Sequence, residues 1–317
     1  MAEGRVPDFF IVGQPKSGTT ALYSMLRRHP QIFLPESKEP WFFADELHER
    51  TPPRPEGTAR TLEQYRALFA AAQPGQIVGE ATPLYLWSRT AASRIAEVKP
   101  QARIVAILRE PAELLRSLHL QFLESYVETE HDLASALALE PERRAGRSIP
   151  RHTYWPKALL YSEHVRYVEQ LRRYENVFPR EQMLVLIYDD FRADNEGTVR
   201  QALRFLGADE SIAVGSVRAN PTVRPRSRAL NELIHAVSVG RGPVSLAVKG
   251  AVKAVTPRQA RRRALRAAKQ RVLYAQPGPP DEPLMLELRR RFAPEVVALS
   301  EHLGRDLVSR WGYDALS

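Results

Sequence analysis

The sequence predicts a P-loop-like, three-layer α/β/α protein with a central, mostly parallel sheet. Apolar runs rich in Ile and Val recur along the chain and alternate with amphipathic stretches, a pattern typical of a parallel sheet covered by helices on both faces. A glycine-bounded turn follows the first apolar run, where such folds bind anions. The expected strands span 9–13, 77–82, 103–110 and 183–190, the expected helices 19–28, 88–98, 111–127, 160–176 and 195–206, and the expected exposed loops 50–60 and 141–156.

The length and composition favour one large domain over the whole chain, residues 1–317. With 317 residues and 44% hydrophobic content, the chain can bury a sizeable core. It has no cysteine, which excludes disulfides, a thiol nucleophile and thiolate zinc sites. The start MAEGRVPDFF lacks a basic region followed by an apolar one, and no run approaches the ~20 apolar residues of a membrane helix. We therefore expect a soluble, cytoplasmic protein.

Positive charge is concentrated in residues 241–275, which we expect to be helical. This segment holds ten Lys or Arg and no acid, whereas the whole chain has a net charge of +9. It is either a solvated basic helix or a docking surface for an acidic or lipid-linked acceptor, with peripheral membrane contact. Nucleic acid is not an expected partner, because aromatic residues that stack on bases are sparse there, Tyr274 excepted. A final helix is expected at 283–303.

The turn after the first strand, within FFIVGQPKSGTTALYSML (9–26), has the spacing of a phosphate-binding loop. Gly13 and Gly18 are separated as in a P-loop, but the lysine lies inside the loop and not after the second glycine. Free N–H groups and the helix dipole at the start of the following helix favour a phosphate or sulfate. The alternative is a simple strand-to-helix turn with a surface lysine. The predicted anion site consists of Lys16, Ser17, Gly18, Thr19 and Thr20.

Two motifs together resemble those of a known family. PKSGTT after an apolar strand resembles the 5′-phosphosulfate loop of sulfotransferases that use 3′-phosphoadenylyl sulfate (PAPS). LREPAELLRS is similar to the 3′-phosphate site of that family, where Arg109 and Ser117 hold the matching positions. The planar guanidinium of Arg109 suits a phosphate. The alternative here is a surface Arg–Glu pair followed by a helical serine.

A third motif, ESKEPWFF (36–43), resembles the loop of carbohydrate-type sulfotransferases that carries the catalytic base. The base position corresponds to Glu39. We expect Trp41 and Phe42 to desolvate this carboxylate and raise its pKa, which makes it a better base. An exposed loop acid is the alternative interpretation. His119, two residues after Ser117, is a second candidate for the base.

Three more stretches extend the resemblance over most of the chain. GEATPLYL (79–86) is similar to a motif near the acceptor, although Ala81 stands where several carbohydrate sulfotransferases have lysine. Tyr188 matches a tyrosine near the adenine, or is a strand-end core residue. Arg226 and Ser227, in NPTVRPRSR, match a loop that closes over the nucleotide, with a solvated basic turn as the alternative. The ending LGRDLVSRW resembles bacterial members. The chain is identified as a member of the PAPS-dependent sulfotransferases, with a motif pattern similar to the carbohydrate and heparan types.

The resemblance implies transfer of a sulfuryl group from PAPS to a hydroxyl or amine, with 3′-phosphoadenosine 5′-phosphate (PAP) as product. Glu39 would be the base and Lys16 would stabilise the leaving phosphate. A small molecule, a carbohydrate or a glycolipid is the expected acceptor, in a pocket formed by residues 44–76 and 120–160. No metal is expected, because no cluster has metal-ligand spacing. The oligomeric state is left open.

Two other functions agree with parts of the sequence. MLVLIYDD resembles a Walker B strand, so that Asp189 or Asp190 would hold Mg²⁺ in a P-loop kinase or NTPase. The displaced lysine speaks against this interpretation. A nucleic-acid or membrane-surface binder acting through 241–275 is the other alternative.

Overall fold

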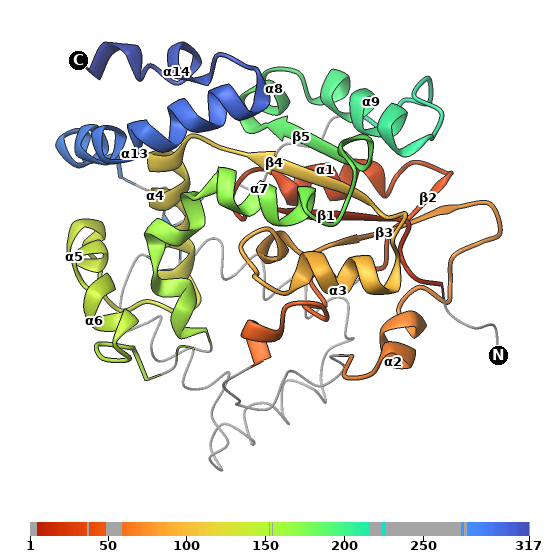
Figure 1. The fold of residues 1–317 in the computed structure, drawn as a ribbon, viewed down its shortest axis with the longest axis horizontal. Helices are drawn as coiled ribbons and strands as arrows, with labels where there is room; N and C mark the ends of the chain where they lie inside the picture. Colours follow the sequence, from red (N-terminus) through yellow and green to blue (C-terminus); the bar gives the residue numbers. More distant parts are fainter. Residues whose placement is uncertain are drawn as a thin grey trace.

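The computed structural model describes residues 5–36, 38–48, 59–151, 153, 155–215, 224–225, 274–275 and 278–316. In this part of the chain five parallel strands form one sheet in the order β2-β3-β1-β4-β5, with helices on both faces (Figure 1). The predicted three-layer fold with a parallel sheet is therefore confirmed. Most of the expected loop 50–60 and of the basic segment 241–275 lies outside the described residues.

The elements of the sheet, and the helices around it, follow one another along the chain. The sheet strands are β1 (Phe9–Gly13), β2 (Ile32–Phe33), β3 (Ile77–Ala81), β4 (Arg103–Leu108) and β5 (Met183–Ile187). A separate antiparallel pair joins β6 (Arg224–Pro225) and β7 (Tyr274–Ala275). The α-helices are α1 (Thr19–Leu26), α2 (Leu62–Ala67), α3 (Ala91–Val98), α4 (Pro111–Glu124), α5 (Leu133–Ala138), α6 (Glu140–Arg144), α7 (Tyr167–Glu175), α8 (Tyr188–Ala193), α9 (Asn195–Leu206), α13 (Glu282–Leu303) and α14 (Leu307–Arg310). Short 3₁₀ turns are η1 (Asp45–His48), η2 (Pro83–Tyr85), η3 (Pro156–Leu159), η4 (Tyr161–Val165), η5 (Arg180–Gln182) and η7 (Asp314–Leu316).

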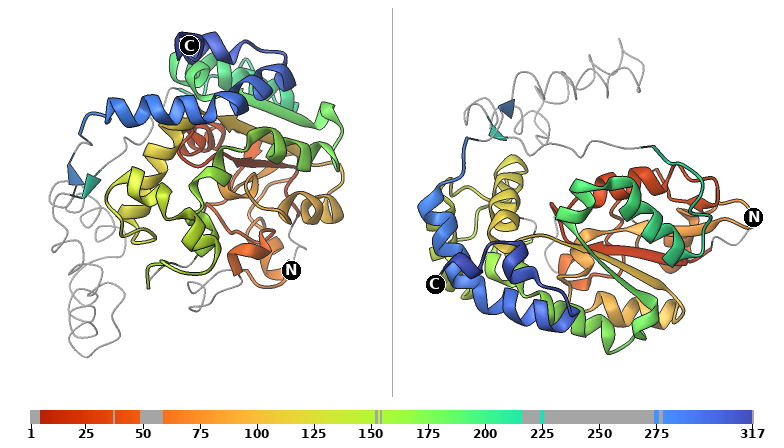
Figure 2. Two further views of the ribbon diagram at one scale, coloured as in Figure 1. Left: turned by 60° about the vertical axis from the view of Figure 1, so that its left-hand side comes forward. Right: turned by 90° about the horizontal axis from the view of Figure 1, so that it is seen from above.

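Alternating residues of the strands fill two cores, one on each face of the sheet. Phe9 and Ile11 of β1 belong to the core shared with α1 and α9, whereas Phe10 and Val12 belong to the core shared with α3, α7 and α13. All four side chains are fully buried, as expected for a central strand whose two faces are both covered. Figure 2 shows the two helix layers on opposite sides of the sheet.

The carboxyl end of β1 is the switch point of the sheet. β1 is hydrogen-bonded to β3 on one side and to β4 on the other, and parallel sheets bind ligands beyond the strand ends at such a point. Gly13 is required here, because a Cβ atom would lie 2.4 Å from Cβ of Leu86. The loop after β1 is therefore held close against the chain that follows η2.

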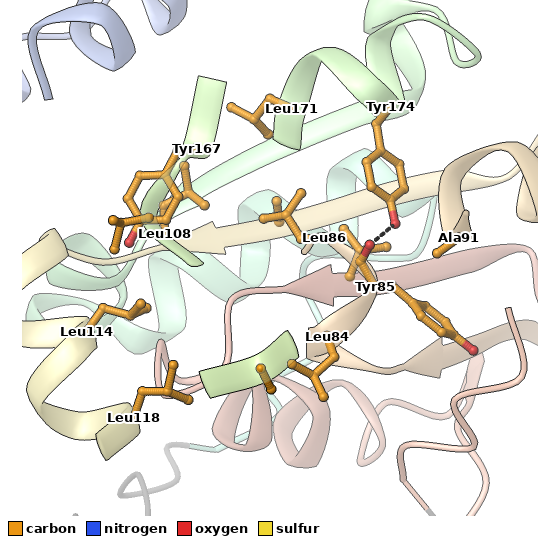
Figure 3. Close-up of a cluster of buried hydrophobic side chains, with 14 of the residues drawn as sticks. Leu84, Tyr85, Leu86, Ala91, Leu108, Leu114, Leu118, Tyr167, Leu171 and Tyr174 are labelled. Atoms are coloured by element: carbon orange, nitrogen blue, oxygen red, sulfur yellow. Dashed lines mark hydrogen bonds between the residues drawn. The ribbon is translucent and has the colours of Figure 1, made fainter. Parts of the chain in front are cut away.

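The larger core joins η2, α4 and α7 over the middle of the sheet. Leu84, Leu114, Leu118 and Leu171 are buried together there (Figure 3). The hydroxyl of Tyr174 donates to the carbonyl oxygen of Tyr85 at 2.9 Å. This contact fixes α7 to the segment that follows β3.

Two predicted elements differ in kind from the structure. The strand expected at 183–190 ends at Ile187, its last partner on β4 being Leu108, and Tyr188 begins α8. The helix expected at 160–176 is replaced by the turn η4 followed by α7, because Leu160 and Arg166 have non-helical backbone angles.

The remaining boundaries differ less. Part of the loop expected at 141–156 is helical, since α6 begins at Glu140. α3 begins at Ala91 and not at Ser88, whose hydroxyl accepts the N–H of Ala91 at 3.0 Å. Other expected helices and strands agree with the structure or differ by one to three residues at an end.

No helix among the described residues has both the length and the apolar character that crossing a bilayer requires.

Replacing Leu171 by alanine should lower the free energy of unfolding by about 2–5 kcal/mol, because it leaves a cavity in the larger core. Denaturant unfolding of the variant and the parent protein measures this difference. The matched control is Leu286→Ala on α13, since Leu286 is 38% exposed, and its effect should be below about 0.5 kcal/mol. Equal losses for the two variants would contradict the assigned core.

Candidate active site

The loop from Gly13 to Thr20 presents a cation and unpaired backbone donors at the switch point. The first helical hydrogen bonds of α1 run from the N–H groups of Ala21 and Leu22 to the oxygen of Gly18, so the N–H groups of Gly18, Thr19 and Thr20 remain available for an anion. The N–H of Ser17 donates to the carbonyl oxygen of Gln14 at 3.3 Å. Lys16 has a positive φ of 62° and a half-buried side chain. Burial lowers the pKa of its ammonium, while the charge of Glu124 opposes the shift.

Tyr188 lies against this loop. Gly18 has a φ of 87°, and a Cβ atom there would be 3.0 Å from the ring of Phe191 and 3.1 Å from that of Tyr188. The guanidinium of Arg109 lies 4.9 Å from the centre of the Tyr188 ring. Tyr188 therefore contacts the loop as the first residue of α8 and not as the last residue of a strand.

Arg109 connects the loop to the start of α4. One guanidinium nitrogen donates to the carbonyl oxygen of Lys16 at 3.1 Å, and another donates to Glu113 at 2.9 Å. The Arg–Glu pair considered above as an alternative therefore exists, but the same guanidinium also contacts the loop. Ser117 lies further along α4 and is 3% exposed. Arg109, the second basic position, is thus hydrogen-bonded directly to the main chain of Lys16, the first basic position.

Glu39 and Lys38 approach the loop from the other side. The ammonium of Lys38 donates to the hydroxyls of Thr19 at 3.3 Å and Thr20 at 3.1 Å, and lies 3.5 Å from the carboxylate of Glu39. Burial lowers the pKa of Lys38. The Glu39 side chain is 36% exposed, so the carboxylate is accessible and has a cation next to it.

The expected aromatic shield of Glu39 is directed elsewhere. Phe42 stacks on Tyr65 with ring centres 4.5 Å apart, and Trp41 meets the ring of Trp155 edge to face at 5.0 Å. The main chain of Glu39 has a φ of 65°, and its N–H donates to the carbonyl oxygen of Ala81. The position of Glu39 is therefore fixed by backbone contact with the end of β3.

Glu80 is a second carboxyl group at this edge, and it is buried. It accepts hydrogen bonds from the hydroxyls of Tyr65 at 2.6 Å, Thr82 at 2.5 Å and Tyr85 at 3.3 Å. Burial raises its pKa to about 7, the three hydroxyls oppose the shift, and the charge of Glu39 adds to it. A carboxyl that is 1% exposed and surrounded by hydroxyls ionises only near neutral pH.

The chain is similar to known proteins in sequence and in fold. A model of the sulfotransferase domain matches residues 6–220, which is more than half of the chain. The chain belongs to the sulfotransferase family. The sulfotransferase from Alicyclobacillus acidocaldarius has a similar crystal structure, with a TM-score of 0.67 and 26% identity, covering 96% of this chain and 98% of that one.

Curated sulfotransferases with carbohydrate names are also similar. Carbohydrate sulfotransferase 15 of Mus musculus is 27% identical over 278 residues, covering 72% of this chain and 49% of that protein. Heparan sulfate glucosamine 3-O-sulfotransferase 6 of Homo sapiens is 31% identical over 207 residues, covering 64% of this chain and 53% of that protein. The chain spans about half the length of the curated relatives it matches.

The structure places His119 in an environment other than the expected one. The residue is 3% exposed, its Nε2 atom lies 2.8 Å from the carbonyl oxygen of Glu130, and its ring meets that of Tyr161. Burial lowers the pKa of the imidazole. No contact brings His119 to the loop within the described residues. Arg226 and Ser227, the other expected nucleotide contacts, lie outside them.

The two aspartates of the Walker B alternative are occupied by C-terminal residues. The carboxylate of Asp190 pairs with Arg305 at 2.7 Å and with Arg310, and Asp189 accepts from the indole N–H of Trp311 at 2.9 Å. They fasten α8 to the end of the chain. Among the described residues, no group of three or more His, Cys, Asp or Glu could hold a metal ion.

Lys38 and Glu80 were missed in the sequence, although both lie in the motifs quoted above. The signal for Glu80 was an acidic residue within a strand expected to be buried on both faces, which is a rare place for an unpaired charge. Lys38 carried no such signal, because only the folded chain brings its ammonium to Thr19 and Thr20.

Replacing Glu80 by glutamine should change how stability depends on pH. Below about pH 4.5 the Glu80 carboxyl is protonated in both the folded and the unfolded protein. Between about pH 4.5 and 7 it ionises only in the unfolded protein. The parent protein therefore loses stability as the pH rises through this range. The variant lacks this loss. Its free energy of unfolding relative to the parent should rise by about 1–3 kcal/mol over this range.

Denaturant unfolding at about pH 5 and about pH 7.5 measures the difference. The control is Glu97→Gln at an exposed position of α3, for which the difference from the parent should be the same at both values. A constant difference for Glu80→Gln would contradict the assigned burial.

Proposed function

We propose that the protein transfers a sulfuryl group from PAPS to a hydroxyl or amine of a saccharide or other small acceptor. The observation that carries the proposal is the direct contact between the two basic positions, Arg109 donating to the main chain of Lys16 at 3.1 Å. A nucleotide with an anion at each end, such as PAPS, fits two adjacent basic positions at a switch point. Membership of the sulfotransferase family and the names of its relatives support it.

The residues present fit such a nucleotide. The start of α1 offers N–H groups and Lys16 a cation for the 5′ end, while Arg109, between β4 and α4, and Ser117 on α4 are assigned to the 3′-phosphate. The ring of Tyr188, next to Arg109 and Gly18, suits the adenine. We assign nucleotide binding also to Ser17, Thr19, Thr20, Arg226 and Ser227, following the family motifs.

When bound, PAPS supplies an activated sulfuryl group whose leaving group is a phosphate. The acceptor oxygen or nitrogen forms the new bond to sulfur as the bond from sulfur to the phosphate oxygen breaks in line with it, and PAP is the product. Glu39 takes the acceptor proton, and Lys16 with the loop N–H groups stabilises the charge on the leaving oxygen. Lys38 holds the carboxylate of Glu39 next to the hydroxyls of Thr19 and Thr20. We propose no metal in this reaction.

The wider features of the protein stay predictions. We propose that residues 1–317 form one sulfotransferase domain; packing of α13 on α4 and α7 supports this. Peripheral membrane contact through 241–275, a cytoplasmic location and a bacterial origin remain expectations from the sequence.

PAP should stabilise the protein against heat much more than adenosine 5′-phosphate does, because that compound lacks the 3′-phosphate. Replacing Arg109 by glutamine should reduce the preference for PAP about 10-fold or more, as expected for loss of a charged hydrogen bond. Thermal melting at graded nucleotide concentrations measures both. The control is Arg192→Gln, whose side chain is 70% exposed on α8.

The same measurement separates the competing function. Protection by ATP with Mg²⁺ and none by PAP would favour a kinase or NTPase and sink the sulfotransferase proposal.

Lys16→Ala and Glu39→Gln should each lower kcat about 100-fold or more, since each removes a group acting on the transition state. Sulfuryl transfer from radiolabelled PAPS to acceptors in a cell extract gives the readout. Two control variants match these changes. Lys99→Ala removes a lysine that lies between α3 and β4 and pairs with Asp8. Glu36→Gln removes a carboxylate at an exposed position. Retained turnover in Lys16→Ala, with the fold intact, would overturn the mechanism.

A further inference from the structure

A cavity of about 400 Å³ lies between η1, the chain after η2 and the segment from α6 to α7. Its volume falls in the range of small-molecule sites. The walls differ from those of an ordinary apolar pocket, because charged residues predominate. The proposed nucleotide site does not use these residues.

Two contacts attach this cavity to the active site. Gln170 on its wall is hydrogen-bonded to Gln14, which directly follows Gly13 at the start of the loop. Trp155, also on the wall, packs on Trp41, two residues after Glu39. The cavity therefore adjoins both the loop that carries Lys16 and the segment that carries the candidate base.

The charge at the mouth of the cavity is unbalanced in favour of cations. Three guanidiniums share the single carboxylate of Glu163: Arg144 at 3.0 Å, Arg166 at 3.7 Å and Arg89 at 3.8 Å. Their side chains are 56%, 52% and 70% exposed, whereas that of Glu163 is 14% exposed. One carboxylate cannot neutralise three guanidiniums, and the exposed faces of the arginines remain open to a further anion.

The other charged residues of the wall do not remove this excess. Glu169 pairs with Arg166 at 2.8 Å and with Arg173 at 2.9 Å. The Nε atom of Arg173 is buried and has no hydrogen-bond partner among the described residues. Glu46 is occupied by the hydroxyls of Ser88 and Thr90. Altogether the wall holds six basic and three acidic side chains, and one of the six, Arg143, pairs with Glu128 below the surface.

Two tryptophans give the cavity flat walls. Trp87 stacks on the ring of His164 at 5.5 Å, and Trp155 is held by Trp41. Fixed indole rings offer a rigid apolar surface for a ring-shaped ligand. Most of the remaining lining residues are charged or polar, although apolar atoms make up the larger share of the wall surface. A sugar suits such a wall, because it has both hydroxyls and apolar ring faces.

We propose that this cavity is the acceptor site and that its acceptor is a saccharide with an anionic group of its own. Arg89, Arg144 and Arg166 hold the anion, and Trp87 and Trp155 hold the sugar ring. A carboxylate, a phosphate or a sulfate on the sugar would each supply the negatively charged oxygens that the arginines bind. The inference rests on the proposed function, because it assigns the acceptor of that reaction.

The test compares two probes that differ in one group. 4-Nitrophenyl β-D-glucuronide and 4-nitrophenyl β-D-glucoside have the same ring, but only the first carries a carboxylate. Calorimetric titration of the full chain with PAP present should show binding of the glucuronide about 10-fold tighter or more. Glucose 6-phosphate and glucose form a second pair that separates phosphate from carboxylate recognition. Equal affinity within both pairs would overturn the proposal.

Variants should change glucuronide affinity in opposite directions. Arg144→Gln and Arg166→Gln should each weaken it about 10-fold, whereas Glu163→Gln should strengthen it, since it removes the competing carboxylate. Poor folding of the Glu163→Gln variant could weaken glucuronide binding but could not strengthen it. The control Arg147→Gln, at an exposed pair with Glu142, should leave affinity unchanged. A loss with Glu163→Gln, or no change with either arginine variant, would contradict the assigned anion position.

Failure of this inference is distinguishable from failure of the proposed function. If PAP stabilises the protein but neither anionic sugar is preferred, the acceptor assignment is wrong and the nucleotide site stands. If PAP does not stabilise the protein, the proposed function fails and the acceptor assignment fails with it.

Discussion

The pairing of β1 with β3 on one side and β4 on the other is the constraint on which the site depends. It occupies both edges of β1, whose faces are buried in the two cores, and leaves only the chain beyond Gly13 free to meet a ligand. The end of β3 fixes Glu39, and the end of β4 leads into Arg109. Residues far apart in the sequence thus arrive at one edge because three neighbouring strands end there.

Burial sets the electrostatics of this edge. Lys16 and Lys38 have pKa values lowered by burial, and Glu80 has one raised by burial. Each shift has the same physical origin, since a partly dehydrated site disfavours any charge without a partner. An anionic ligand would provide that partner for Lys16, whereas Lys38 already lies 3.5 Å from the carboxylate of Glu39. An anion in the loop would therefore offset the cost of burying the Lys16 ammonium, in agreement with the proposed role of Lys16 at the leaving phosphate.

The sequence was most informative where function and local structure coincide. The loop with Lys16, the strand before it and the helix α9 could be placed because their spacing is local. The end of β5 was misjudged, since it is set by where β4 ends and not by the composition of MLVLIYDD. The cavity arginines were not found for a similar reason: Arg89 and Arg144 reach Glu163 only through tertiary packing, and only Arg166 is close to it in the sequence.

The contacts that each candidate already makes support the proposal that Glu39 is the base. The ring of His119 is buried against Glu130 and Tyr161, and the carboxyl of Glu80 is enclosed by three hydroxyls. Neither group can meet an acceptor without breaking these contacts, which would leave a buried polar group unsatisfied. The carboxylate of Glu39 is 36% exposed, and the ammonium of Lys38 joins it to the hydroxyls at the start of α1. Of these three groups, Glu39 alone is exposed enough to exchange a proton with an acceptor beside the loop and with water, which supports its proposed role as the base.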